Sequence, residues 1–303
     1  MDEITSTNDS FMIQSEEEEC SFSKHQWLPI KFILTSVIGS GVAIFGIFGN
    51  ITTAFVLTRP LMRTPNNLYL TALAIFDILV LVLGILLYAT EYIQEYFDNV
   101  QMYILWTSST PYLYAMSNFA QTGSVYITVS VTFERYLAVL YPRLSQQQCT
   151  KPRAGCVIGF VTVFAALFNA SKFFEVEVVQ NENCTGFASR GLAPSELLMD
   201  PIYGTVYTLW LTQFIMVFFP FAVLLTINTA IVWNFRKSLR QLDCKVIDSS
   251  DRGTLKEQSR DATRVLVTIV VVFLICNCWG FVITVMESIY GGHHLTMIFG
   301  ANY

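Results

Sequence analysis

The residues best placed for chemistry are Glu134, Arg135 and Tyr136, near the end of the apolar run SVYITVSVTFERYLAVLYPR (124–143). Placing two charges beside a membrane-crossing segment costs free energy, so we expect these two residues to have a function. One interpretation is a switch, in which Glu134 holds Arg135 in a local ion pair and, when protonated or displaced, frees the guanidinium for a cytoplasmic partner. The other is an anchor, in which both side chains only reach the inner headgroups.

A polar stripe precedes Arg135 along the same predicted helix. Its members recur at helical spacing, at Ser117, Gln121, Ser124, Thr128 and Thr132. With about 3.6 residues per turn, these positions share one face with Arg135. We therefore expect a polar face toward a bundle interior, which favours the switch. The side chains expected to face lipid are Val125, Ile127, Val129 and Val131.

Composition indicates which elements position these residues. The chain has 303 residues, of which 53% are hydrophobic and 14% charged, whereas soluble domains carry about 25% charged residues. Six segments are long enough to cross about 30 Å of hydrocarbon. They lie at about 32–57, 68–90, 105–137, 154–174, 203–235 and 262–289. The sequence thus predicts an all-α membrane protein, with a helix bundle at 32–289 between a tail at 1–31 and a short end at 290–303.

The distribution of charge predicts the orientation. If the N-terminus is outside, 14 of the 18 Lys and Arg residues are cytoplasmic, and 16 of the 23 Asp and Glu residues are outside. This arrangement follows the positive-inside rule and predicts a multi-pass protein of the plasma membrane. The acidic outer face suits a basic ligand, and the basic inner face suits an acidic protein surface or the anionic leaflet of the bilayer. Nothing in the sequence supports binding to nucleic acid.

Four motifs carry a resemblance to a known family. ERYLAV resembles the Glu/Asp-Arg-Tyr motif at the end of the third helix of rhodopsin-like G-protein-coupled receptors. GNITTAFVLTR (49–59), NLYLTALAIFD (67–77) and FFPFAVLLTIN (218–228) resemble motifs of their first, second and fifth helices. More narrowly, AQTGSVYITVSVTFERYLAVLYP and FNASKFFEVEV are similar to invertebrate receptors for FMRFamide-type neuropeptides. The resemblance implies a rhodopsin-like bundle of seven helices, an extracellular peptide ligand and a heterotrimeric G protein inside.

The resemblance also implies roles for single residues. Arg135 would be the pivot of the coupling switch and Glu134 its restraint, with Tyr136 beside them. Asn50 and Asp77 would form an intramembrane polar pair, at a depth where a carboxylate costs about 3 kcal/mol. The resemblance implies a sodium-linked switch at Asp77, and a purely structural hydrogen bond is the alternative. No other cofactor and no other metal site is expected.

Acidic and aromatic residues at the outer end suggest the ligand class. A carboxylate beside an aromatic ring suits the amidated Arg-Phe end of an FMRFamide-like peptide, through ion pairing and cation–π contact. The candidates are Glu91, Glu95, Tyr114, Gln121, Glu175, Glu177 and Glu287. The alternative is a solvated rim with interfacial aromatic residues. The sequence does not decide which glutamate binds the arginine.

The cysteines depart from the pattern of the family. Of the seven, only Cys20 and Cys184 fall on the outer side, where disulfides persist. The family usually ties its second outer loop to the top of the third helix, but here that position falls at about Thr110 and the segment has no cysteine. We therefore expect Cys184 to pair with Cys20 and to pin the N-terminal tail across the binding mouth. Asn8 and Asn183 begin Asn-x-Ser/Thr sequences and are expected to be glycosylated.

The resemblance weakens toward the C-terminal end. Only 13 residues follow Tyr290, too few to span a bilayer, and the seventh-helix Asn-Pro-x-x-Tyr motif is absent. Two explanations stay open: a truncated or misassembled product of a working receptor gene, which we favour, or a six-span isoform that cannot signal and acts on full-length partners. A small transporter or channel is the rival from another class, but no inverted repeat or string of intramembrane carboxylates supports it. No Ser/His, paired-Asp or metal-spaced set indicates an enzyme.

Overall fold

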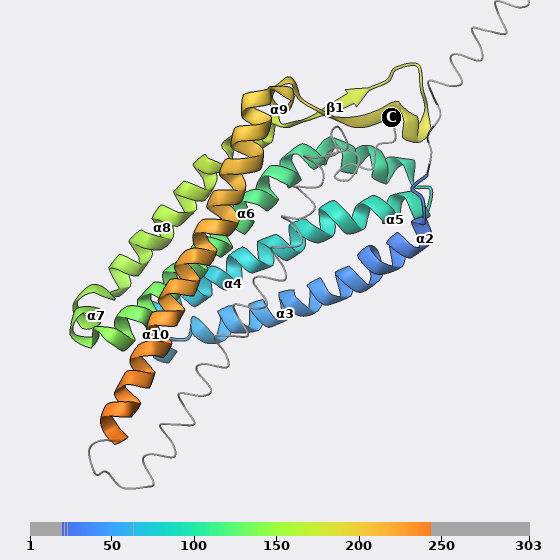
Figure 1. Ribbon diagram of the computed structural model, residues 1–303. Helices are drawn as coiled ribbons and strands as arrows, with labels where there is room; N and C mark the ends of the chain where they lie inside the picture. The colour runs from blue at the N-terminus through green and yellow to red at the C-terminus, as the bar shows by residue number, and fades with distance from the viewer. Residues whose placement is uncertain (1–19, 21, 23, 63, 244–303) are drawn as a thin grey trace, which may run out of the picture.

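The computed structural model describes Cys20, Phe22, residues 24–62 and residues 64–243. Long helices lie side by side, and a β-hairpin lies over the end of the bundle where α2 begins (Figure 1). Following the predicted orientation, we name this end outer and the opposite end inner. The predicted sixth span at 262–289, the end at 290–303, Glu287 and Asn8 lie outside the described residues.

The first two predicted spans lie in two long helices. The first joins α2 (Leu28–Lys31), a π-helical segment (Phe32–Gly39) and α3 (Ser40–Leu57). The second joins α4 (Pro65–Gly84), a π-helical segment (Ile85–Ala89) and α5 (Thr90–Tyr96). It begins at Pro65 because proline suits a first turn and because the Thr64 hydroxyl accepts a hydrogen bond from the Asn67 N–H at 3.2 Å. Since α5 continues the helix past residue 90, Glu91 and Glu95 stand on a regular element.

The central element is α6 (Val100–Leu140), a helix of 41 residues. It packs against α4, α8 (Lys151–Phe168) and α10 (Phe219–Asp243), and α7 (Pro142–Gln148) joins it to α8 (Figure 1). The apolar core between α4, α6 and α8 comprises Tyr69, Phe76, Ile127, Val131, Ala154 and Val161. The prediction that Ile127 and Val131 face lipid is therefore wrong. Their exposed fractions are 0% and 6%, because a helix packed on three sides leaves little surface for lipid.

A close contact sets the separation of α4 and α6. Gly123 of α6 faces the ring of Phe76 on α4, and a Cβ atom at Gly123 would lie 2.2 Å from a ring carbon. No side chain fits there without displacing the ring. The absence of a side chain at Gly123 thus lets α6 come close to α4. The next residues along the two helices, Ser124 and Asp77, are joined by a hydrogen bond at this depth.

The outer hairpin is an element that the all-α prediction did not include. Strand β1 (Val176–Gln180) pairs antiparallel with β2 (Arg190–Pro194), with Val178 opposite Leu192. It is fixed to α6 because the Tyr103 hydroxyl donates a hydrogen bond to the Arg190 carbonyl at 2.8 Å. A short α9 (Glu196–Met199) then leads into the fifth predicted span, which begins as a π-helical segment (Ile202–Leu211).

Four helical stretches among the described residues are long and apolar enough to cross a membrane: Leu28–Leu57, Pro65–Tyr96, Lys151–Phe174 and Phe214–Asn234. The 41-residue α6 is longer than each of them, but its Ser, Thr, Asn and Gln side chains lower its mean hydropathy. A polar helix in the middle of apolar ones is the arrangement expected of a bundle that keeps its polar groups inside.

Candidate functional site

A polar face of α5 forms the first part of the site. Glu91, Gln94 and Glu95 lie three and four residues apart and so share one side of the helix. Their exposed fractions are only 9%, 1% and 3%. His25 covers this face: its backbone N–H donates to Glu95 Oε1 at 2.5 Å, and its Nδ1 lies 2.5 Å from Glu95 Oε2. Its Nε2 lies 3.6 Å from Glu91 Oε1, which is longer than a hydrogen bond.

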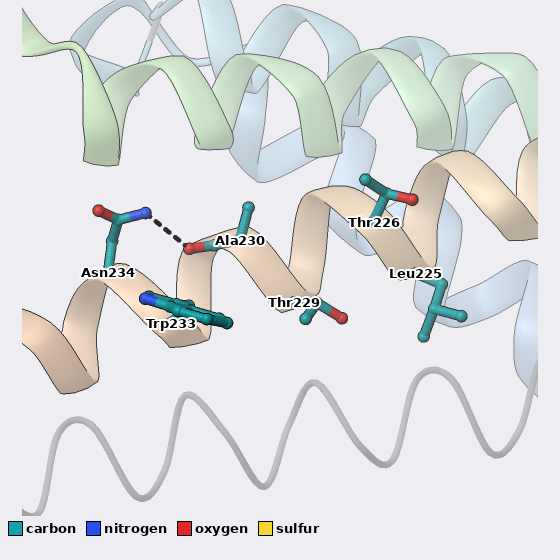
Figure 2. Close-up of a pocket in the computed structure, with 6 residues that line it drawn as sticks. All are labelled: Leu225, Thr226, Thr229, Ala230, Trp233 and Asn234. Atoms are coloured by element: carbon teal, nitrogen blue, oxygen red, sulfur yellow. Dashed lines mark hydrogen bonds between the residues drawn. The ribbon is translucent and has the colours of Figure 1, made fainter.

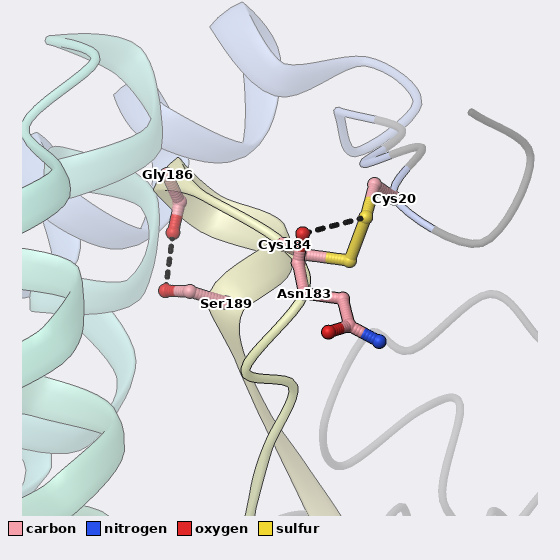
Figure 3. The surroundings of a disulfide bond; sticks show 5 residues. All are labelled: Cys20, Asn183, Cys184, Gly186 and Ser189. Atoms are coloured by element: carbon pink, nitrogen blue, oxygen red, sulfur yellow. Dashed lines mark hydrogen bonds between the residues drawn. A yellow bond between two sulfur atoms is a disulfide. The ribbon is translucent and has the colours of Figure 1, made fainter. Parts of the chain in front are cut away.

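The segment that carries His25 is tied down at several points, and we call its described residues, Cys20, Phe22 and 24–27, the strap. Figure 3 shows the disulfide that joins Cys20 to Cys184, with Cα atoms 5.3 Å apart. This is the pairing that the sequence predicted. The ring of Phe22 stacks on that of Phe187 in the loop between the two strands, with centroids 5.0 Å apart. The strap therefore links the second outer loop to α5.

A second charged contact of the strap lies at the surface. Lys24 Nζ lies 2.5 Å from Asp98 Oδ1, and the two side chains are 49% and 63% exposed. Exposed pairs of this kind contribute little to stability because water and salt screen them. The His25–Glu95 contact, whose side chains are only 15% and 3% exposed, is thus the stronger of the two polar attachments of the strap.

Glu175 lies in a different cluster, at the outer ends of α8, α6 and the fifth predicted span. Lys172 Nζ is 2.7 Å from Glu175 Oε1, and their side chains are 2% and 1% exposed. The Tyr203 hydroxyl donates to the same oxygen at 2.7 Å, and the Tyr114 hydroxyl donates to Oε2 at 3.4 Å. A buried carboxylate is stable only with such partners. Glu175 therefore has its acceptors filled by the protein itself.

Three predicted outer residues take part in neither cluster. Glu177 on β1, Gln121 on α6 and Asn183 beside the disulfide are all exposed. The exposed Asn183 side chain is the one that would carry a glycan. Sequence reasoning missed His25, Gln94, Lys172 and Tyr203. Lys172 could have been found from its three-residue spacing to Glu175, and Gln94 from its place on the helix face of Glu95. The contact of His25 spans 70 residues of chain and leaves no local pattern.

The middle of the bundle holds Asp77, but not with the predicted partner. The Ser124 hydroxyl of α6 donates to Asp77 Oδ1 at 2.5 Å. The Asn50 amide instead donates to the Gly46 carbonyl of its own helix at 3.0 Å. The predicted hydrogen bond between Asn50 and Asp77 is therefore not formed. A polar side chain inside a helix readily bonds the carbonyl four residues back, which satisfies Asn50 without α4.

At the inner end, Glu134 and Arg135 do not form the predicted ion pair. Glu134 lines a cavity of about 360 Å³ together with Tyr69, Cys149 and Arg153, and its Oε2 atom is buried without a hydrogen-bond partner within residues 24–62 and 64–243. Arg135 is exposed and makes no salt bridge with the residues that the structure describes. Neighbouring residues on a helix point about 100° apart, so adjacent charges do not face each other.

Arg135 nevertheless lies on the face that the polar stripe predicted. It follows Ser124 by eleven residues, about three whole turns, so both share the side of α6 that Ser124 turns toward α4. Tyr136, the next residue, is half-buried, and its ring stacks on that of Phe133 with centroids 6.2 Å apart. By this helical phase, Arg135 stands at the inner end on the side of α6 that faces α4, and the residue is exposed there.

The architecture is matched by a sequence comparison. The family described as "7 transmembrane receptor (rhodopsin family)" matches residues 49–299, which is most of the chain. The chain belongs to this family. The rhodopsin-like helix bundle that the four motifs predicted is therefore confirmed, and so is the prediction that the protein is a multi-pass membrane receptor and not an enzyme.

Individual relatives of this receptor include proteins named as FMRFamide receptors. It is 28% identical to the FMRFamide receptor of Drosophila melanogaster over 89% of this chain and 49% of the relative. It is 29% identical to the FMRFamide peptide receptor frpr-18 of Caenorhabditis elegans over 82% of this chain and 56% of the relative. Human neuromedin-U receptor 2 is 25% identical over 87% of this chain and 61% of the relative. The chain thus spans about half the length of the first two relatives.

A cavity lies along the middle of α10. Figure 2 shows the residues that line a cavity of about 580 Å³ there: Leu225, Thr226, Thr229, Ala230, Trp233 and Asn234. The Asn234 amide donates to the Ala230 carbonyl of its own helix at 3.0 Å, so it offers little to a ligand (Figure 2). None of these side chains is charged. We assign this cavity no part in the site.

Proposed function

We propose that this receptor binds an extracellular neuropeptide with an amidated Arg-Phe end at its outer end and transmits binding to a heterotrimeric G protein at its inner end. The observation that carries the proposal is the polar face of α5, where two glutamates stand together, nearly buried, at 9% and 3% exposure. A cation is the natural partner of such a pair. Family membership and the names of the two FMRFamide-receptor relatives support the same ligand class.

Among the outer carboxylates, Glu91 and Glu95 are the ones we propose for the ligand arginine. Glu175 already accepts from Lys172 and from two tyrosine hydroxyls, so a ligand would have to displace three partners. Glu91 makes no hydrogen bond to His25, and the side-chain hydrogen bonds of Glu95 within the described part of the chain are those to His25. Tyr92 lies between them on α5 and offers an aromatic ring. We assign Glu175 and Tyr114 a structural role instead.

The orientation belongs to the same proposal. With the N-terminus outside, the Cys20–Cys184 disulfide lies in an oxidising compartment, as such bonds require. The exposed Asn183 then lies where glycosylation occurs. The same orientation leaves Arg135 at the cytoplasmic end, where its exposed guanidinium is available to an acidic protein surface.

We further propose that the ionisation of Asp77 is linked to sodium. The Asp77 carboxylate and the Ser124 hydroxyl, 2.5 Å apart, are oxygen donors of the kind that hard cations prefer. Sodium would favour the ionised carboxylate. Replacing Asp77 with Asn should make peptide affinity independent of sodium concentration, and a persisting sodium dependence in this variant would contradict the role.

The central test is direct stimulation. Cells that express the chain at their surface are exposed to FMRFamide, and G-protein dissociation is followed by resonance energy transfer. We expect a saturable response that Glu91→Gln and Glu95→Gln both weaken by at least about tenfold, since charge-assisted contacts contribute most to such recognition. Glu177→Gln, on the exposed hairpin, is the matched control and should leave the response unchanged. Equal responses in all three variants would refute the proposed site.

A further inference from the structure

The polar face of α5 is incompletely satisfied by the group that covers it. His25 contacts both oxygens of Glu95, but its Nε2 has no hydrogen-bond partner among the described residues and lies 3.6 Å from Glu91 Oε1. Gln94 is only 1% exposed, and its side-chain Oε1 also has no hydrogen-bond partner in the part of the chain that the structure describes. A buried acceptor that lacks its hydrogen bond is unfavourable. The face therefore holds more acceptor capacity than His25 uses.

A guanidinium matches this face better than an imidazole does. An imidazole offers two ring nitrogens in fixed and diverging directions, whereas a guanidinium offers five N–H donors in a planar fork. Two carboxylates and one amide oxygen on neighbouring turns of a helix can receive donors that spread in this way. The acceptors that His25 leaves without a hydrogen bond thus indicate that this face of α5 suits a cationic group with more N–H donors than an imidazole has.

We infer that Glu91, Gln94 and Glu95 form a guanidinium-binding subsite that the receptor's own His25 occupies, so that the strap and the arginine of a peptide ligand compete for it. The inference rests on the proposed function and adds an internal competitor to it. Other strap contacts resemble those of a cationic, aromatic peptide: the ring of Phe22 stacks on Phe187, and the ammonium of Lys24 pairs with Asp98.

The attachments of the strap would allow His25 to leave the polar face of α5 and to return to it. Its covalent anchor, the Cys20–Cys184 disulfide, and its junction with α2 at Leu28 lie at its two ends, while His25 lies between them. The Lys24–Asp98 pair is exposed and weak. Release of His25 therefore breaks its two part-buried hydrogen bonds to Glu95 and leaves the segment tethered. A tethered competitor acts at a high effective concentration, which lowers the apparent affinity of a free ligand.

Competition predicts that one substitution strengthens ligand binding. The full chain is expressed at the cell surface, and the Kd of fluorescent FMRFamide is measured per surface receptor. We expect His25→Ala to tighten binding about tenfold, because the competing side chain is gone. His25→Gln, which keeps a polar side chain, should tighten it in the same direction. Gln26→Ala is the matched control, since Gln26 is an exposed residue of the same strap, and it should not change the Kd.

A substitution on α5 should act in the opposite direction. Glu95→Gln also removes the contact with His25, but it takes away the carboxylate that the ligand needs, so we expect binding to weaken by at least about tenfold. If His25 only stabilised the fold, His25→Ala and Glu95→Gln would both weaken binding. Weaker or unchanged binding in His25→Ala would therefore overturn the inference while leaving peptide binding itself established.

A second readout separates the inference from the proposed function. Amide hydrogen exchange of the strap reports release of His25, whose N–H is bonded to Glu95. We expect FMRFamide to accelerate this exchange in the wild-type receptor. If FMRFamide binds no variant, the proposed function fails, and millimolar arginine amide then serves as the guanidinium probe. Faster exchange with arginine amide would support the subsite, and unchanged exchange would overturn it.

Discussion

At the outer end, Glu95, Asp98 and Glu175 each lie within 2.5 to 2.7 Å of a basic side chain from the same chain. At the inner end, Glu134 has a buried oxygen to which no described residue donates a hydrogen bond, and the neighbouring Arg135 is exposed. The outer contacts join the strap to α5 or surround a buried carboxylate, whereas the inner charges are adjacent in sequence. The paired charges are thus either brought together across 70 and 74 residues of chain, at the strap, or lie three residues apart, at Lys172 and Glu175, whereas the directly adjacent Glu134 and Arg135 do not pair.

The difference separates structural charges from charges that remain available to a partner. The Lys172–Glu175 pair is buried and complete, so a change there should affect folding. Arg135 has no such partner among the described residues, so a change there should affect signalling and not stability. His25 is intermediate, because its Nδ1 contacts Glu95 whereas its buried Nε2 has no hydrogen-bond partner among the residues that the structure describes.

The strongest test of the inner end is Arg135→Ala. We expect G-protein activation by FMRFamide to be lost, because the exposed guanidinium is the group proposed to meet the G protein, while the Kd for the peptide stays measurable. Activation is followed by energy transfer between G-protein subunits, and binding is followed with fluorescent peptide. Arg143→Ala is the matched control, since Arg143 is also exposed at the inner end. Equal activation by Arg135→Ala and the wild type would remove the assigned role.

The strongest test of the outer end is Lys172→Met. This change leaves the Glu175 carboxylate buried without its cation, and removing one partner of a buried pair costs about 3–5 kcal/mol. We expect a much lower melting temperature of the receptor in detergent and reduced surface expression. The double variant Lys172→Met/Glu175→Met should recover much of the loss, because no uncompensated charge remains. A melting temperature unaffected by the single change would show that the pair has no structural role.

The differences between the outer and inner ends also explain which features of the fold and the site could be predicted from the sequence. The helices, the polar stripe through Ser124 and Arg135, and the Cys20–Cys184 pairing follow from length, periodicity and counting, which are local or topological properties. The partners of Asp77 and Glu134 do not. Each depends on which side chain of a neighbouring helix reaches the same depth, and one sequence does not contain that information.

The misassigned lipid face of α6 has a similar physical cause. Polar periodicity correctly located one interior side of the helix, but it did not reveal how many neighbours the helix has. Since α4, α8 and α10 all pack against α6, Ile127 and Val131 are buried as well. In a bundle, apolar side chains face either lipid or protein, and hydrophobicity alone does not distinguish the two.

Gly123→Ala tests the close contact between α4 and α6, which lies between the outer and inner ends of the bundle. The new methyl group would lie 2.2 Å from a carbon of the buried Phe76 ring, so α4 and α6 must separate or the ring must move. We expect a loss of about 1–3 kcal/mol in stability, measured as a lower melting temperature in detergent. Gly155→Ala is the matched control, because a Cβ atom there meets nothing within 4 Å. A loss confined to Gly123 would show that the helices need this close approach.

The smallest expected effect distinguishes the two polar contacts of the strap. Lys24 and Asp98 are 49% and 63% exposed, so Lys24→Ala should change stability by only about 0.2–1 kcal/mol and less at high salt. Melting in detergent at low and high ionic strength measures both effects. The His25–Glu95 contact is nearly buried and should respond less to salt. If Lys24→Ala instead matched His25→Ala in stability and in peptide affinity, the strap would be held by surface charge, and the buried face of α5 would lose its special part in ligand competition.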